Sequence, residues 1–261
     1  MDKPQRNALG VFGILAVVIT LICCVLPRIA QPAWYHHFAN QRSLLGIPNF
    51  GDVVSNLPFA VFGLWGIAWM LRALGGIGPV RFIDRREVGP YLAVFCGLVL
   101  TAFGSAYYHL APDNARLVWD RLPLIMTMMA LVAAVIAERV DAGLGLSLLP
   151  VLMAIGGASV LQWYWSERVG AGDMRFYAAV QAYAVLVILF ALFLPGRYTR
   201  GWDFGVVFGL YAVAKVFELC DGWIFRELHV VSGHTLKHLA AAMAGYWILR
   251  MLVKREPVAA V

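Results

Sequence analysis

Charged side chains are scarce in this sequence. They account for 14% of its 261 residues, whereas about 25% is usual in soluble domains. Hydrophobic residues account for 61% and form long runs, without the ~10-residue stretches of alternating polarity that a membrane barrel needs. The composition therefore excludes an ordinary soluble domain and predicts an all-α, multi-pass integral membrane protein.

The sequence is also poor in cysteine, and it has no evident repeat, low-complexity stretch or long linker. Its four cysteines, Cys23, Cys24, Cys96 and Cys220, lie inside apolar segments without a pairing pattern, which argues against a disulfide or cysteine–metal framework. The net charge of +6 comes from arginines between the apolar runs rather than from a patch. We therefore expect no nucleic-acid partner and attribute these charges to orientation in a bilayer.

Eight apolar runs, separated by Gly- and Pro-containing breaks, predict eight transmembrane helices. The first run, Leu9–Leu26, is an additional N-terminal helix beside a seven-helix core. The core runs are Phe50–Leu74, Val88–Leu110, Leu117–Glu138, Leu144–Trp165, Arg175–Leu194, Trp202–Ile224 and His234–Leu252. We divide the chain into a transmembrane helix at 1–30, an interfacial loop at 31–49, the core at 50–253 and a cytoplasmic tail at 254–261.

Two short motifs place polar side chains in this apolar setting. Ser105 and His109 are four residues apart, as are His234 and His238, so each pair shares one helical face. Asp120 follows His109 by eleven residues. Ionisable groups are costly in a membrane, and they indicate a functional site there.

The distribution of Lys and Arg predicts which way the helices run. With the N-terminus inside, twelve of these residues fall on the cytoplasmic side and eight on the outer side, which favours both termini in the cytoplasm. The same threading brings the helix ends that carry His109, Asp120 and His234 to the outer side. We therefore expect the two motifs to meet there.

Three imidazoles and one water form a common catalytic zinc site, and His109, His234 and His238 supply three imidazoles. Zinc lowers the pKa of its bound water toward ~7. Asp120 can orient or deprotonate that water, and Ser105 can hydrogen-bond a developing oxyanion. The motifs thus predict metal-assisted hydrolysis of an amide or ester, and the membrane setting predicts a lipid substrate.

Each of these residues also has a structural interpretation. His109 alone suits an interhelical hydrogen bond, and Asp120 suits an ion pair with Arg121 or a helix cap.

The same holds for polar residues on two other helices. Lys215 and Glu218 suit a charge-compensated pair that locks the bundle, and Asp221 lies near enough to the outer end to touch the site's surroundings. Ser55 and Asn56 suit interhelical hydrogen bonds or the lining of a cavity.

The sequence resembles the alkaline ceramidase family, within the membrane hydrolase superfamily that also contains the progestin and adiponectin receptors. The resemblance rests on three sequence motifs: Ser55-Asn56-Leu57-Pro58-Phe59, Gly104-Ser105-Ala106-Tyr107-Tyr108-His109 and Ser232-Gly233-His234-Thr235-Leu236-Lys237-His238. The likeness runs from about Asn49 to Leu252.

The resemblance implies a seven-helix core around a zinc ion that is bound by His109, His234 and His238. It gives Asp120 the acid–base role and places Ser105 beside the zinc. The reaction implied is cleavage of the N-acyl amide of ceramide. The segment before Asp52 has no carboxylate from position 35 onward, so the calcium site of the animal enzymes is not expected.

We therefore expect a zinc-dependent amidohydrolase acting on ceramide or a related N-acyl lipid in a bacterial inner membrane. One alternative is a non-enzymatic receptor or scaffold with a structural zinc. Another is a transporter that uses Lys215, Glu218 and Asp221 as a charge relay. The sequence does not indicate an oligomeric state.

Overall fold

The chain folds as a bundle of helices, seen here in a computed structural model that describes residues 3–78 and 81–258. Within these residues there is no β-strand, and only two isolated bridges are present. The helices are α1 (Lys3–Val25), η1 (Ala33–His36), α2 (Phe50–Val54), α3 (Leu57–Leu74), η2 (Arg85–Glu87), α4 (Val88–Leu110), α5 (Asn114–Arg139), α6 (Ala142–Arg168), α7 (Arg175–Ala191), α8 (Asp203–Leu219), α9 (Asp221–Leu228) and α10 (Gly233–Lys254). The predicted all-α class is confirmed.

Several helices have the length and composition of membrane spans. Five segments of the described chain qualify: Lys3–Val25, Phe50–Leu74, Arg85–Leu110, Asn114–Arg139 and Ala142–Arg168. α7 and α8 have 17 residues each, which gives a rise of about 26 Å against a hydrocarbon core of about 30 Å. The structure thus has the character of a multi-pass membrane protein, while the count of seven plus one spans stays a prediction.

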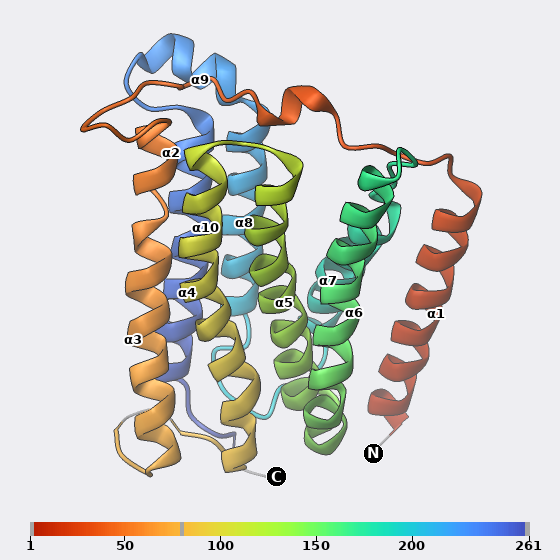
Figure 1. Cartoon of the computed structure of the whole chain (residues 1–261). Helices are drawn as coiled ribbons and strands as arrows, with labels where there is room; N and C mark the ends of the chain where they lie inside the picture. The colour runs from red at the N-terminus through yellow and green to blue at the C-terminus, as the bar shows by residue number, and fades with distance from the viewer. Residues whose placement is uncertain (1–2, 79–80, 259–261) are drawn as a thin grey trace.

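Two of the predicted helices are interrupted near one end. The run that starts at Phe50 is divided into α2 and α3. Pro58 has no N–H to donate to the carbonyl four residues earlier, so the helical hydrogen bonds are interrupted at Ser55 and Asn56. At this break the side-chain amide of Asn56 donates to the Asp52 carbonyl at 2.7 Å. The other interruption is at Cys220, where α8 ends and the short α9 turns across the end of the bundle (Figure 1).

α5 is the central helix, and α1 is the most peripheral. Every residue from Met129 to Arg139 in α5 is buried, whereas α1 buries only Ala8 and Phe12. α4 packs against α3 and α5, α10 packs against α8, and α1 stands at the edge of the bundle beside α7 (Figure 1).

The two ends of the bundle carry different polar groups. The end of α4 and the starts of α5 and α10 lie at one end, together with α2 and α9, whereas α1 starts and α10 finishes at the other (Figure 1). The prediction that His109, Asp120 and His234 share one end is confirmed.

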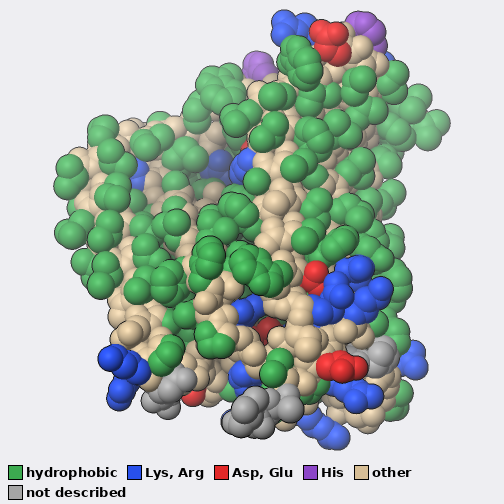
Figure 2. Space-filling view, turned by 180° about the vertical axis from the view of Figure 1, so that it is seen from behind, with side chains coloured by type: hydrophobic (Ala, Val, Ile, Leu, Met, Phe, Trp, Pro, Cys, Tyr) green, Lys and Arg blue, Asp and Glu red, His purple; other side chains and the backbone are tan. Residues whose placement is uncertain are grey.

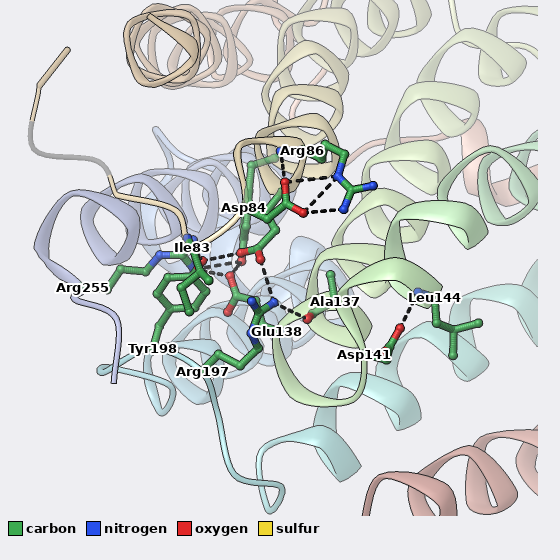
Figure 3. Close-up of polar contacts among 12 residues, drawn as sticks. Ile83, Asp84, Arg86, Ala137, Glu138, Asp141, Leu144, Arg197, Tyr198 and Arg255 are labelled. Atoms are coloured by element: carbon green, nitrogen blue, oxygen red, sulfur yellow. Dashed lines mark hydrogen bonds and ion pairs between the residues drawn. The ribbon is translucent and has the colours of Figure 1, made fainter. Parts of the chain in front are cut away.

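The opposite end holds a buried ionic cluster (Figure 3). Arg255, which is 2% exposed, forms an ion pair with Glu138, and the Tyr91 hydroxyl donates to the same carboxylate at 2.5 Å. Arg197 pairs with Glu87 at 2.7 Å. These contacts tie the α7–α8 connection and the end of α10 to α4 and α5.

Candidate metal centre

Three histidine side chains from two helices converge at the end of the bundle. His109 is the penultimate residue of α4, and His234 and His238 lie one turn apart at the start of α10. Each offers a ring nitrogen within 4.8 Å of the others, and the ring centroids are 4.8–4.9 Å apart. Their exposed fractions are 0%, 5% and 3%, so all three rings are buried.

Two glycines allow the helices to approach closely around this group. A Cβ at Gly104 of α4 would lie 2.0 Å from the Trp119 carbonyl of α5. A Cβ at Gly233, the first residue of α10, would lie 2.2 Å from the Phe217 carbonyl of α8. A larger residue at either position would therefore displace the helix that carries a histidine or the aspartate.

Hydrogen bonds orient His238. The Ser55 hydroxyl donates its single proton to the Asp52 carbonyl at 3.1 Å, and it lies 2.8 Å from His238 Nδ1. With that proton on the carbonyl, the hydroxyl can accept a bond from Nδ1–H, and Nε2 of His238 is then the nitrogen with a free lone pair. A neutral imidazole in this tautomer is ready to bind a metal.

Backbone contacts hold the other two histidines in place. The Asn49 side-chain amide donates to the His109 carbonyl at 2.8 Å, where α4 ends. The His234 N–H donates to Asp221 Oδ1 at 2.8 Å, and Asp221 Oδ2 accepts from the Ala39 N–H at 2.9 Å. Asp221 thus joins α9, the start of α10 and the connection between α1 and α2.

That connection also covers the histidines. Phe38 is 6% exposed, and its ring lies 4.6 Å from the His109 ring and 4.5 Å from the His234 ring, measured between centroids. Residues of the segment predicted as an interfacial loop therefore form one wall of the site.

The ring nitrogens fit a metal ion. Among the described residues, both ring nitrogens of His109 and Nε2 of His234 are buried without a hydrogen-bond partner. Buried polar atoms normally have a partner, because leaving one unpaired costs about 1–3 kcal/mol. Three converging imidazoles with unpaired nitrogens are the donor set of a metal site. The structure thus supports the predicted ligands His109, His234 and His238 as a group that can hold a metal ion.

A cavity of about 210 Å³ adjoins the triad. His238, Ser105 and Asp120 lie on its wall, together with side chains of α7, α8 and α10. A second cavity of about 120 Å³ shares Phe59 and Tyr211 with the first and is lined almost wholly by apolar side chains. The two cavities therefore present a polar end at the histidines and an apolar continuation into the bundle.

Ser105 and Asp120 are not engaged elsewhere. Within the described part of the chain, neither side chain forms a hydrogen bond or an ion pair, although Ser105 is 1% exposed. Arg121, the expected partner of Asp120, donates instead to Gln31 at 2.5 Å, and Asp113 caps α5. The structural interpretation of Asp120 is therefore not borne out, and both groups face the cavity.

The expected pair of Lys215 and Glu218 is present and extends further. Lys215 Nζ lies 2.7 Å from one Glu218 oxygen, and Lys237 Nζ lies 3.1 Å from the other. All three residues line the larger cavity, whereas Asp221 is occupied by backbone amides. Lys215, Glu218 and Asp221 therefore do not form the continuous charge relay that a transporter would use, because Asp221 contacts backbone amides and not Glu218.

Two residues around the triad, Asp52 and Phe38, could not be assigned to the site from the sequence. Asp52 is fully buried, and it accepts hydrogen bonds from Thr235 at 2.7 Å and Ser232 at 3.3 Å. A carboxylate at the start of the apolar Phe50–Leu74 run was a signal of the same kind as Asp120. Phe38 gave no comparable signal, because an aromatic residue in a loop has many possible roles.

No protein-family model matches this chain, and no curated protein matches it.

Proposed function

We propose that the protein is a zinc-dependent amidohydrolase that cleaves the N-acyl bond of ceramide or a related N-acyl lipid. The observation that carries this proposal is the position of Ser105 and Asp120. Both are unengaged and lie on the wall of the cavity that His238 and the buried triad adjoin. A metal site beside a free carboxylate and a free hydroxyl has the groups that hydrolysis needs.

The metal proposed is zinc, held by His109, His234 and His238. Imidazole is a preferred zinc ligand, and three histidines are a common set in catalytic zinc sites. When bound, zinc polarises a carbonyl and lowers the pKa of water toward ~7, which makes hydrolysis possible at neutral pH.

The other side chains have separate roles. The Asp120 carboxylate accepts a proton from the attacking water and returns it to the nitrogen of the leaving amine when the C–N bond breaks. The Ser105 hydroxyl donates a hydrogen bond to the oxygen of the former carbonyl as negative charge develops there. The products are a carboxylic acid and an amine.

The shape of the two cavities supports a lipid substrate. A polar group can lie near Ser105 and Asp120 while an acyl chain extends past Phe59 and Tyr211 into the apolar cavity. Figure 2 shows a hollow in the upper half of one face of the bundle, between columns of hydrophobic side chains. A membrane lipid reaching the site from the bilayer would suit such a surface.

The proposed setting is a bacterial inner membrane. The chain would cross it with a seven-helix core and the additional helix α1, with both termini in the cytoplasm and the zinc site toward the outer side. Membership of the alkaline ceramidase family is part of the same proposal and rests on the three sequence motifs described above.

Metal analysis and lipid hydrolysis test the proposal together. Purified wild-type protein is expected to contain about one zinc ion per chain, and His109→Ala is expected to lose it. Wild type is expected to release fatty acid from ceramide or another N-acyl lipid. Asp120→Asn keeps the size of the side chain and removes its basicity, so it is expected to bind zinc while hydrolysis falls by about 10²-fold or more.

The outcomes separate an enzyme from a scaffold. Zinc that is bound without turnover of any N-acyl lipid, and whose removal lowers only the thermal midpoint, would indicate a structural site. Equal rates for wild type and Asp120→Asn would remove Asp120 from the mechanism.

A further inference from the structure

Two lysines and one glutamate line the cavity beside the histidine triad, and we name Lys215, Glu218 and Lys237 the lysine cluster. Glu218 bridges the two ammonium groups, with Nζ–O distances of 2.7 Å to Lys215 and 3.1 Å to Lys237. The Tyr35 hydroxyl also points to Glu218, at 3.5 Å. A single carboxylate therefore forms ion pairs with two ammonium groups.

The other charged residues of the cavity do not balance the cluster. Asp120 and Arg121 are the remaining charged side chains on its wall, and they cancel in formal charge. Arg121 is also held by Gln31 and by the rings of Trp163 and Tyr177, whose centroids lie 4.2 Å and 4.8 Å from its guanidinium carbon. The cavity wall thus carries one positive charge in excess.

Lys237 lines the same cavity as Ser105, Asp120 and His238. It lies on α10 directly before His238, and its side chain is 17% exposed. Lys215 is further out, with a side chain that is 48% exposed. Figure 2 shows Lys or Arg side chains inside the hollow of the bundle, within a surface of hydrophobic groups. An unbalanced charge in such surroundings is costly unless an anion pairs with it.

We infer that the lysine cluster selects N-acyl lipids whose amine part carries an anionic group, as in the carboxylate of an N-acyl amino acid. The inference rests on the proposed hydrolysis and names its substrate class. The acyl chain would extend into the apolar cavity, and the anion on the other side of the amide would pair with Lys237. The competing explanation is that these ion pairs only hold the helices together. A purely structural role of this kind would not distinguish between anionic and neutral lipids.

The test compares two amides with the same acyl chain, N-oleoylglycine and N-oleoylethanolamine, which differ in charge on the amine side. The ratio of their kcat/KM values is measured for wild type, Lys237→Gln and Lys237→Arg. Wild type is expected to favour the glycine amide by about tenfold or more, as a charge-assisted hydrogen bond allows. Lys237→Gln is expected to lose most of this preference, and Lys237→Arg to keep it.

Lys254→Gln is the matched control, because Lys254 is exposed at the opposite end of the same helix. It is expected to keep the wild-type ratio. The inference is overturned if wild type shows no preference for the anion, or if Lys237→Gln loses the same factor on both amides.

A second readout does not depend on turnover. N-oleoylglycine is expected to raise the thermal midpoint of wild type more than N-oleoylethanolamine does, and Lys237→Gln is expected to remove the difference. If no N-acyl lipid is hydrolysed, ceramide included, the proposed function fails, while this comparison of thermal midpoints still decides whether the cavity selects an anion.

Discussion

At the residue scale, the orientation of His238 depends on one hydroxyl. Ser55 lies at the break between α2 and α3, where the backbone departs from a continuous α-helix. The break points the Ser55 hydroxyl at His238 Nδ1, 2.8 Å away. Such an outer contact fixes the tautomer of a metal ligand and commonly contributes 10–100-fold to metal affinity.

Ser55→Ala is therefore expected to weaken zinc binding by about 10–100-fold while the protein remains folded. The measurement is a competition titration against a chelator of known affinity. Ser147→Ala is the control, because the Ser147 hydroxyl donates to the Leu144 carbonyl of its own helix. Equal affinity of Ser55→Ala and wild type would show that another group fixes the ring.

The sequence predicts which residues belong to the site better than it predicts their partners. The triad, Ser105 and Asp120 were found because polar groups in apolar runs are costly, and helical spacing then placed them on shared faces. The partners of these residues were not found. Whether Asp120 meets Arg121 or the cavity depends on side-chain directions across several helices, and the sequence does not encode these locally.

At the element scale, α1 is attached to the bundle by few contacts. The guanidinium of Arg175 at the start of α7 donates to the Cys23 carbonyl at 2.8 Å and also to the Leu26 carbonyl. Asp173 holds that guanidinium at 2.7 Å. The hydrogen bond from Arg175 lowers the pKa of Asp173 below its ordinary value of 3.8.

Asp173→Asn is expected to lower the thermal midpoint in detergent, because the guanidinium loses its fixed partner. A carboxyl group whose pKa is lowered in the folded state stabilises that state above the unfolded pKa, and it loses this effect as pH falls further. The difference between wild type and Asp173→Asn is therefore expected to be full above pH 3.8 and to shrink below it. A difference that does not change with pH would contradict this assignment.

The helices themselves were largely predictable. Long apolar runs bounded by Gly and Pro give the ends of α4 and α6 to within a few residues. The interruptions at Ser55 and Cys220 were not predicted, because each falls inside a run whose hydropathy continues. There the chain departs from a straight helix to satisfy local hydrogen bonds, which hydropathy does not report.

At the scale of the whole molecule, polar groups are concentrated at the two ends of an apolar bundle. One end holds the histidine triad, and the other holds the ionic cluster around Arg255 and Glu138 (Figure 3). The guanidinium of Arg255 also stacks on Tyr198, with its central carbon 3.9 Å from the ring centroid. The cluster closes the bundle by linking α10 to α5 and to the α7–α8 connection.

Arg255→Met is expected to destabilise the protein by about 3–5 kcal/mol, because Glu138 is left buried without its cation. Denaturant unfolding in detergent measures the change. Arg86→Met is the control, because the Arg86 side chain is 75% exposed beside Asp84, and its loss is expected to change stability little. If the two variants unfold alike, the cluster does not stabilise the bundle. Zinc content is expected to be unchanged in both.

The triad has a further consequence for how the protein is made. His109 belongs to α4, but His234 and His238 belong to α10, which follows every other described helix along the chain. Synthesis proceeds from the N-terminus, so a nascent chain presents a single imidazole of the three until α10 has entered the bundle. A metal ion held by all three histidines, as proposed above, would therefore be acquired only after α10 has joined the bundle.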